Sequence, residues 1–174
     1  MPAMTTELLL IRHGESEANV GRSKDPNCPL TDHGLEQART VGLRLADYDL
    51  SGFVAVTSPY ARAVQTAAEI ARMTRLSFKE DDSVREWGEL ATLGGREYPR
   101  EAVGSVIDRL NGFLRRYQGR KVLVVSHAAP ISVLTHLAWG ERPPTQGNFW
   151  EAVGNCCPRW VKTTCEGSRL EKPR

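Results

Sequence analysis

The chain alternates between short apolar runs and longer segments in which apolar residues recur at helical spacing, and this alternation limits the folds open to it. The apolar runs at 8–11, 53–57 and 121–126 have the length and composition of buried strands. Helical patterns stand between them, and the sequence has no internal repeat. Strands that alternate with helices are typical of an α/β domain. We therefore expect a three-layer α/β sandwich whose mostly parallel central sheet is flanked by helices.

The helices are predicted from the residues at their ends. Thr31 can cap one helix, and Ser58 as N-cap with Pro59 at the first helical position opens the next. An apolar face runs over 102–117, and Gly119 ends that helix. The remaining expectations are a helix from Pro130 to about Trp139, an edge strand at 76–80, an irregular loop at 81–100 and a hairpin over 159–171 that turns at Glu166-Gly167.

Length and charge argue against several classes of protein. With 174 residues, the chain is expected to form one domain, 1–174. Its 23 basic and 21 acidic side chains give a net charge of +2, which argues against a nucleic-acid partner. The apolar runs are far shorter than the roughly 20 residues of a membrane-spanning helix, so no membrane partner is expected. Residues 1–7 lack a basic segment followed by an apolar one, and we expect a cytoplasmic location.

Two of the predicted strands deliver a histidine to the same edge of the sheet. His13 and His127 each come two residues after an apolar run, Arg12 precedes His13, and Arg62 falls in the first turn of the helix after another strand. Because the carboxyl ends of parallel strands meet at one edge, these four side chains are expected to converge. Paired guanidinium donors and a helix N-terminus suit a phosphoryl group.

Four ordered blocks of sequence support this expectation. They are Arg12-His13-Gly14-Glu15-Ser16, the helix start at 30–38, the block Ser-Pro-x-x-Arg-Ala-x-Gln-Thr-Ala at 58–67, and Val-Val-Ser-His at 124–127. Together they resemble the histidine phosphatase superfamily, which includes the cofactor-dependent phosphoglycerate mutases, and the chain is most similar to its short phosphatase branch. The resemblance spans residues 8 to about 135 and implies the same α/β fold. The pair Ala128-Ala129 stands where relatives often carry two glycines.

The resemblance implies a role for each matching residue. His13 would attack phosphorus and become transiently phosphorylated, after which water hydrolyses the phosphohistidine. The side chains implied to hold the phosphate or substrate are Arg12, Ser16, Asn19, Arg62 and His127, of which Arg12, Arg62 and His127 would also offset charge in the transition state. For Asn19, an ordinary loop cap is the alternative.

The mechanism also needs a general acid to protonate the leaving group. Glu86 stands at the position where the family has a glutamate after the Arg62 helix. The sequence that follows departs from the family pattern, so Glu89 is an alternative acid and Glu15 a more distant one. No cofactor or metal is implied, and the four cysteines lack the spacing of a zinc site.

Length then favours one activity among those known in the family. Phosphoglycerate mutases of this family are longer, both between the Arg62 and His127 positions and at the C-terminus. A mutase must keep water from its intermediate, whereas a phosphatase must admit it. We therefore expect a phosphomonoesterase that acts on a small phosphorylated metabolite, with residues 81–117 as an insert that covers the site. Three alternatives remain: a protein phosphohistidine phosphatase, a phosphoglycerate mutase and a non-catalytic phospho-ligand binding module. The helix at 102–117 argues against the first of them. The sequence does not predict the oligomeric state.

Overall fold

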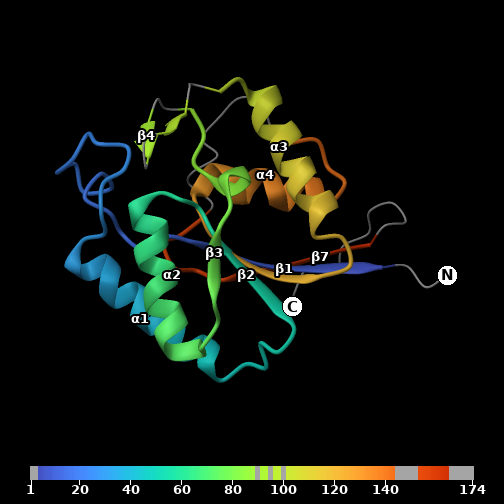
Figure 1. The fold of residues 1–174 in the computed structure, drawn as a ribbon, viewed down its shortest axis with the longest axis horizontal. Coiled ribbons are helices and arrows are strands. Elements are labelled where there is room, and N and C mark those ends of the chain that lie inside the picture. The colour runs from blue at the N-terminus through green and yellow to red at the C-terminus, as the bar shows by residue number, and fades with distance from the viewer. Residues whose placement is uncertain (1–3, 89–90, 94–95, 99–100, 144–152, 165–174) are drawn as a thin grey trace.

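The central sheet follows the predicted order of short strands. The computed structural model describes residues 4–88, 91–93, 96–98, 101–143 and 153–164. Within these residues the main sheet is ordered β3-β2-β6-β1-β7 (Figure 1). Its strands are β1 (Thr5–Arg12), β2 (Phe53–Thr57), β3 (Phe78–Glu80), β6 (Lys121–Ser126) and β7 (Arg159–Thr164). The first four are parallel to one another, and β7 runs antiparallel to β1.

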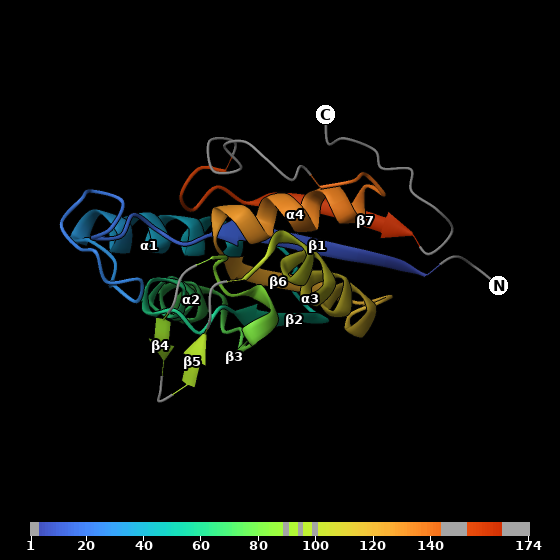
Figure 2. The ribbon, with the colours of Figure 1, turned by 90° about the horizontal axis from the view of Figure 1, so that it is seen from above.

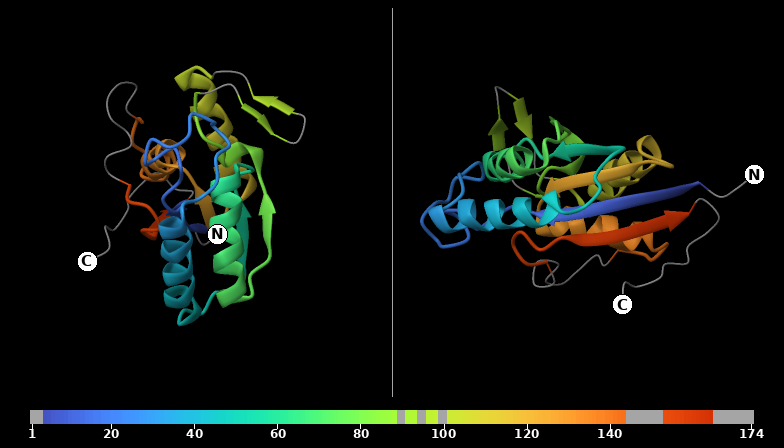
Figure 3. Two further views of the ribbon diagram at one scale, coloured as in Figure 1. Left: turned by 90° about the vertical axis from the view of Figure 1, so that its left-hand side faces the viewer. Right: turned by 90° about the horizontal axis from the view of Figure 1, so that it is seen from below.

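Two helices cover each face of this sheet. The helices α1 (Asp32–Ala46) and α2 (Ala61–Thr74) lie on one face, and α3 (Val103–Arg116) and α4 (Ala128–Ala138) lie on the other (Figure 3). Successive side chains of a strand point to opposite faces, so Leu8 and Leu10 pack with α3 and α4, whereas Leu9 and Ile11 pack with α1 and α2. The predicted three-layer sandwich is confirmed. None of the described helices is long and apolar enough to cross a bilayer.

The prediction for the start of α2 was wrong. The helix begins at Ala61, and its N-cap residue is Tyr60, which makes no side-chain cap bond. The Ala61 N–H instead donates to Asn27 Oδ1 at 2.7 Å, from a loop far away in the sequence. Ser58 lies outside the helix, and its hydroxyl faces His127. A cap supplied by a distant loop leaves no local sequence signal. The predicted cap of α1 is confirmed, since Thr31 Oγ1 accepts the Gly34 N–H at 3.0 Å.

The helix α4, by contrast, begins before its predicted start. It starts at Ala128, with His127 as the N-cap residue, and not at Pro130. Pro130 therefore occupies the third helical position. This position still lies in the first turn, where a backbone N–H has no partner within the helix, so the proline costs no hydrogen bond there.

The segment between β3 and β6 is more ordered than predicted. Residues 81–100 were expected to form an irregular loop, but they contain the short helix η1 (Asp82–Val84) and the antiparallel strands β4 (Ala91–Leu93) and β5 (Arg96–Tyr98). This hairpin projects from the rest of the fold (Figure 2). The Gly94-Gly95 dipeptide between the two strands is a turn signal that the prediction passed over. At the other end of the chain, the first strand of the predicted 159–171 hairpin is β7, while the turn at Glu166-Gly167 lies outside the described residues.

The helix α3 is part of the core. Val106, Leu110 and Phe113 are fully buried and belong to the same apolar cluster as Leu8 and Leu10 of β1. Because α3 is one of the two helices that cover its face of the sheet, its presence alone does not narrow access to the carboxyl edge.

Two glycines let the first loop approach α1. A Cβ on Gly34 would stand 2.0 Å from the Glu15 carbonyl oxygen, and one on Gly14 would stand 2.4 Å from the Gly34 carbonyl oxygen. Both clashes are with backbone, which cannot swing away as a side-chain end can. The chain therefore needs glycine at both positions to bring the segment after β1 onto the start of α1.

We predict that Gly34→Ala lowers the free energy of unfolding by about 1–3 kcal/mol, the usual cost of overpacking a tight contact. Gly104→Ala is the matched control, because Gly104 also lies in the first turn of a helix and its Cβ would meet nothing within 4 Å. That control should raise the unfolding free energy by up to about 1 kcal/mol, the difference in helix propensity. Urea denaturation measures both. Equal effects of the two substitutions would contradict the close approach.

Candidate active site

The carboxyl ends of four neighbouring strands build the site. His13 follows β1, Ser58 follows β2, and His127 follows β6. Glu86 arrives from the segment after β3, and Arg62 lies in the first turn of α2. The His13 and His127 rings meet edge to face with centroids 5.1 Å apart, and Arg62 Nε lies 3.1 Å from His13 Nε2. The structure thus brings together His13, Arg62 and His127, three of the four side chains that were predicted to converge, and the charge of the fourth, Arg12, also acts on His13.

The protonation of His13 follows from its partners. Its Nδ1 lies 2.6 Å from the carbonyl oxygen of Gly14, which can only accept, so Nδ1 carries the hydrogen. Nε2 is then a lone-pair acceptor and receives the Nε–H of Arg62. Burial, reinforced by the charge of Arg62, holds the pKa of His13 well below its usual value. The imidazole is therefore neutral near pH 7, with its lone pair turned toward the arginines.

His127 is fully buried between two other site residues. Its Nε2 lies 2.8 Å from Ser58 Oγ, and its Nδ1 lies 3.6 Å from Glu86 Oε2. Burial and then the charge of Arg62 lower the pKa of His127 well below the usual value, so this ring is also neutral near pH 7. Within the described residues, Nδ1 has no hydrogen-bond partner.

The two arginines are anchored by backbone oxygens. Arg12 Nη1 donates to the Val153 carbonyl at 2.8 Å, and Arg62 Nη1 donates to the Pro26 carbonyl at 2.5 Å. In the described part of the chain, the buried Nε of Arg12 has no hydrogen-bond partner. Buried polar groups without a partner are uncommon and call for an explanation. Here the two such atoms, Arg12 Nε and His127 Nδ1, belong to the same cluster, as expected of an anion site.

Glu86 completes the cluster. Its Oε2 lies 4.0 Å from Arg62 Nη2, and its Oε1 accepts the Trp87 N–H at 2.9 Å. Only 21% of the side-chain surface is exposed, and burial raises the pKa of Glu86, although the Trp87 bond and the charges of Arg62 and Arg12 act in the opposite direction. A raised pKa is what a carboxyl group needs to deliver a proton near neutral pH.

Of the two alternative acids, Glu15 lies in surroundings different from those of Glu86. The carboxylate of Glu15 accepts the Thr31 hydroxyl at 2.8 Å and so helps to hold the start of α1. Glu89 lies outside the described residues.

Ser16 and Asn19 bond each other in the loop after β1. Asn19 Oδ1 accepts the Ser16 N–H at 3.0 Å and the Ser16 hydroxyl at 3.1 Å, which is the loop cap considered as an alternative role for Asn19. Asn155 Nδ2 donates to the His13 carbonyl at 2.7 Å and approaches Asn19 Oδ1 at 3.5 Å. The sequence prediction gave no site role to Asn155 or Ser58. Ser58 did carry a signal, but it was interpreted as a helix cap.

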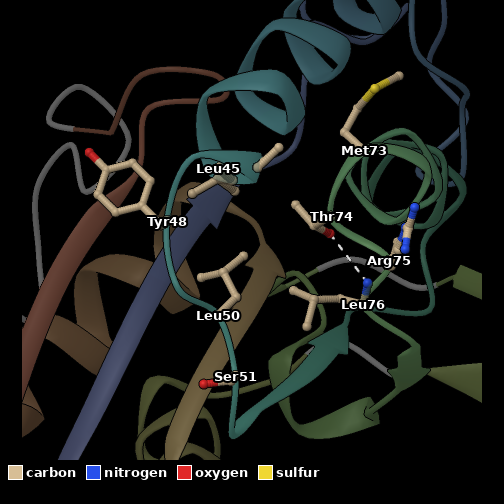
Figure 4. Close-up of a pocket in the computed structure, with 9 residues that line it drawn as sticks. Leu45, Tyr48, Leu50, Ser51, Met73, Thr74, Arg75 and Leu76 are labelled. Carbon is tan, nitrogen blue, oxygen red and sulfur yellow. Dashed lines mark hydrogen bonds between the residues drawn. The ribbon is translucent and has the colours of Figure 1, made fainter.

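A hollow lies at the opposite end of the molecule from the cluster around His13. Leu45, Leu50 and Leu76 line it together with Thr74 and Arg75, where α1 and α2 end (Figure 4). Thr74 Oγ1 bonds the Ile70 carbonyl at 2.8 Å and accepts the Leu76 N–H at 3.4 Å, so this hydroxyl is occupied by neighbouring backbone. The hollow is separate from the carboxyl edge of the sheet and takes no part in the cluster around His13.

Comparisons with known proteins agree with the geometry at this edge. A sequence profile described as histidine phosphatase superfamily (branch 1) matches residues 8–102. The chain belongs to the histidine phosphatase superfamily. Over 155 residues it is 32% identical to the uncharacterized phosphatase PhoE of Bacillus subtilis, and this match covers 78% of the chain and 79% of that protein. The resemblance seen in the sequence blocks is therefore confirmed.

Mutases and solved structures give two further comparisons. A 2,3-bisphosphoglycerate-dependent phosphoglycerate mutase of Azorhizobium caulinodans is 38% identical over 95 residues, which cover 49% of this chain and 45% of the mutase. A solved structure of an Escherichia coli protein described as an alpha-ribazole-5'-P phosphatase has a TM-score of 0.73 at 22% identity, and the match covers 95% of this chain and 94% of that one. At this identity the likeness shows the fold alone.

The burial of two neutral histidines predicts a pH-dependent stability. An unfolded histidine titrates near 6.5, whereas His13 and His127 titrate well below their usual value in the folded protein, so below pH ~6.5 the unfolded chain binds more protons. Stability is therefore lost as pH falls from 6.5 toward the folded pKa, by up to about 1.4 kcal/mol per pH unit for each histidine. The raised pKa of Glu86 has the opposite sign, since its contribution is lost as pH rises through the folded pKa.

We expect urea titrations at pH 7.5 and 5.5 to show a smaller stability difference for His13→Gln than for the parent protein. His33→Gln is the control, because His33 is exposed in the first turn of α1. An identical pH response in the parent protein and His13→Gln would contradict the neutral, buried state of His13.

Proposed function

We propose that the protein is a phosphomonoesterase that hydrolyses a small phosphorylated metabolite through a phosphohistidine on His13. The observation that carries this proposal is the neutral imidazole of His13, whose Nδ1 hydrogen is held by Gly14 and whose Nε2 lone pair faces Arg62. A nucleophilic nitrogen must be unprotonated so that its lone pair can attack. Charged donors must also form hydrogen bonds to the phosphoryl oxygens.

The proposed first step transfers the phosphoryl group to His13. The guanidinium N–H groups of Arg62 and the unpartnered Nε of Arg12 bind the non-bridging oxygens, which frees the Nε2 lone pair to face phosphorus. As the new N–P bond forms, the P–O bond to the leaving group breaks. Glu86 gives its proton to the departing alkoxide, and an alcohol leaves.

The second step returns His13 to its starting state. Glu86, now ionised, takes a proton from a water molecule that attacks phosphorus, and the N–P bond breaks. Inorganic phosphate leaves, His13 is neutral again and Glu86 is protonated. In both steps His127 and the arginines offset the charge on the equatorial oxygens, and the neutral His127 donates from whichever ring nitrogen carries its hydrogen. Ser16 and Asn19 are proposed to contact the substrate from the loop after β1.

Hydrolysis is favoured over phosphoglycerate mutation by the extent of the matches. The chain aligns with 79% of PhoE, but with only 45% of the Azorhizobium mutase. We propose that the part of 81–117 that covers the site is the segment around Glu86, because α3 packs into the core. With α3 in the core, its presence no longer argues against a protein substrate, so a phosphohistidine protein belongs in the assay. A cytoplasmic location stays a prediction from the sequence.

The role of His13 as nucleophile and the role of Glu86 as general acid can be tested separately with substrates that differ in their leaving group. An aryl phosphate such as 4-nitrophenyl phosphate leaves without much protonation, whereas an alkyl phosphate requires it. We expect His13→Ala to abolish release of phosphate from both. Glu86→Gln should lower kcat for the alkyl ester by about 100-fold or more and should affect the aryl ester much less.

The matched control for Glu86→Gln is Glu80→Gln, because Glu80 is an exposed carboxyl at the end of β3. It should leave both rates unchanged. Equal losses on the two esters in Glu86→Gln would contradict the acid role of Glu86. Turnover that persists in His13→Ala would contradict the nucleophile.

A panel of metabolite phosphates, phosphoglycerates and a phosphohistidine protein tests the choice of reaction. We expect inorganic phosphate to be released from small esters, and phosphoglycerates to be interconverted more slowly than they are hydrolysed. Faster interconversion would identify a mutase, and activity confined to the phosphohistidine protein would identify a protein phosphatase. Binding of phosphate with no turnover of any substrate would identify a binding module.

A further inference from the structure

A buried ion-pair cluster adjoins the segment that carries Glu86. It consists of Arg85, Glu101 and Arg109, and we refer to it as the Glu101 cluster. Arg109 donates two hydrogen bonds to the Glu101 carboxylate, from Nε to Oε1 and from Nη2 to Oε2, both 2.9 Å long. Arg85 Nη2 donates to the same Oε1 at 2.5 Å. The three side chains are only 10–15% exposed.

Further bonds tie the residues on both sides of Glu86, through backbone before it and through a side chain after it. Arg109 Nη1 donates to the Ser83 carbonyl at 2.6 Å, and Arg109 Nη2 donates to the Arg85 carbonyl at 3.1 Å. On the other side of Glu86, Trp87 Nε1 donates to the Glu101 carbonyl at 3.1 Å. The segment that carries Glu86 is thus tied to α3 and to the residue before its N-cap.

We propose that Arg109 is a positioning residue that acts through Glu86, holding its carboxyl group against His127 and Arg62. This inference rests on the proposed function, in which Glu86 is the general acid. Arg109 lies on a core helix, whereas Glu86 lies within the described residues 85–88 that follow η1 and form neither helix nor strand. A side chain in such a segment keeps a productive geometry only if bonds from rigid elements fix it.

A positioning role of Arg109 can be distinguished from an electrostatic effect on Glu86, because the Glu101 cluster contains both positive and negative side chains. Among the described residues, the charged or titratable groups that face Glu86 are Arg12 from β1, Arg62 from α2, His127 at the start of α4 and Arg109 from α3. Removing the charge of Arg109 favours the protonated form of Glu86. Removing the charge of Glu101 leaves Arg109 uncompensated and favours the ionised form. A positioning role predicts the same loss in both variants, whereas a purely electrostatic role predicts pH profiles displaced in opposite directions.

The experiment measures kcat and kcat/KM of the whole 174-residue chain for a series of phosphate monoesters whose leaving groups range from 4-nitrophenol to an aliphatic alcohol. Arg109→Gln and Glu101→Gln are compared with Glu86→Gln and with Arg115→Gln, which removes an exposed positive charge from the same helix. Arg109→Lys, which keeps the charge but loses the planar fork, provides a milder variant should Arg109→Gln fold poorly. Thermal unfolding and circular dichroism report the folded fraction of each.

We expect kcat for the aliphatic ester to fall about tenfold or more in Arg109→Gln and Glu101→Gln, with a change of less than about threefold for the aryl ester. Arg109→Lys should lie between Arg109→Gln and the parent protein, and Arg115→Gln should match the parent. For the aliphatic ester, kcat of the double variant Glu86→Gln/Arg109→Gln should be no lower than kcat of Glu86→Gln, because Arg109 acts only through the Glu86 carboxyl group.

The outcomes separate this inference from the proposed function. If Glu86→Gln discriminates between the esters and the cluster variants lose both activities equally, or not at all, the positioning role is overturned and the acid role stands. Oppositely displaced pH profiles in Arg109→Gln and Glu101→Gln, without a shared loss on the aliphatic ester, also overturn it. If the parent protein hydrolyses none of the esters, or Glu86→Gln does not discriminate between them, the proposed function fails and the inference fails with it.

Discussion

Because a carbonyl oxygen can only accept a hydrogen bond, the 2.6 Å contact between His13 Nδ1 and the Gly14 carbonyl determines where the imidazole carries its hydrogen. The nucleophilic lone pair on Nε2 follows from that contact. The contact in turn depends on the backbone after β1, which is held where Gly14 and Gly34 approach each other without side chains. The Gly14 N–H also donates to Thr66 Oγ1 of α2 at 3.0 Å, so two helices and one strand set the orientation of a single ring.

Burial then determines the charge state of the cluster. The same desolvation that lowers the pKa of His13 and His127 raises the pKa of Glu86, so the protein interior favours the neutral form of all three. The arginines stay charged, because a guanidinium is too basic to lose its proton in a protein. The result is a cluster in which two charged arginines lie against two neutral histidines and a carboxyl group whose pKa is raised. A dianionic phosphate ester is the kind of ligand that such a cluster would stabilise.

The core helix α3 links stability to the site. Its apolar face packs against the sheet through residues such as Leu110, while Arg109, the preceding residue in the sequence, points to the segment that carries Glu86. A buried pair such as Arg109 and Glu101 is weak evidence for stability, because desolvation offsets much of its attraction. Its geometry is better explained by what Arg109 holds in place, namely the Ser83 and Arg85 carbonyls in the backbone just before Glu86.

Sequence periodicity determined most of the fold. Strands β1, β2 and β6 and all four helices were predicted, because burial on both faces of a sheet demands short continuous apolar runs and burial of one helix face demands helical spacing. The histidines and arginines were also found, because the ends of parallel strands meet at one edge by geometry alone. The tertiary structure alone decided how Asn27 caps α2, how Ser58 came to face His127, and how Arg109 and Glu101 came to hold the Glu86 segment. These are single hydrogen bonds between residues far apart in sequence, and such bonds leave no periodic or local pattern from which they could be predicted.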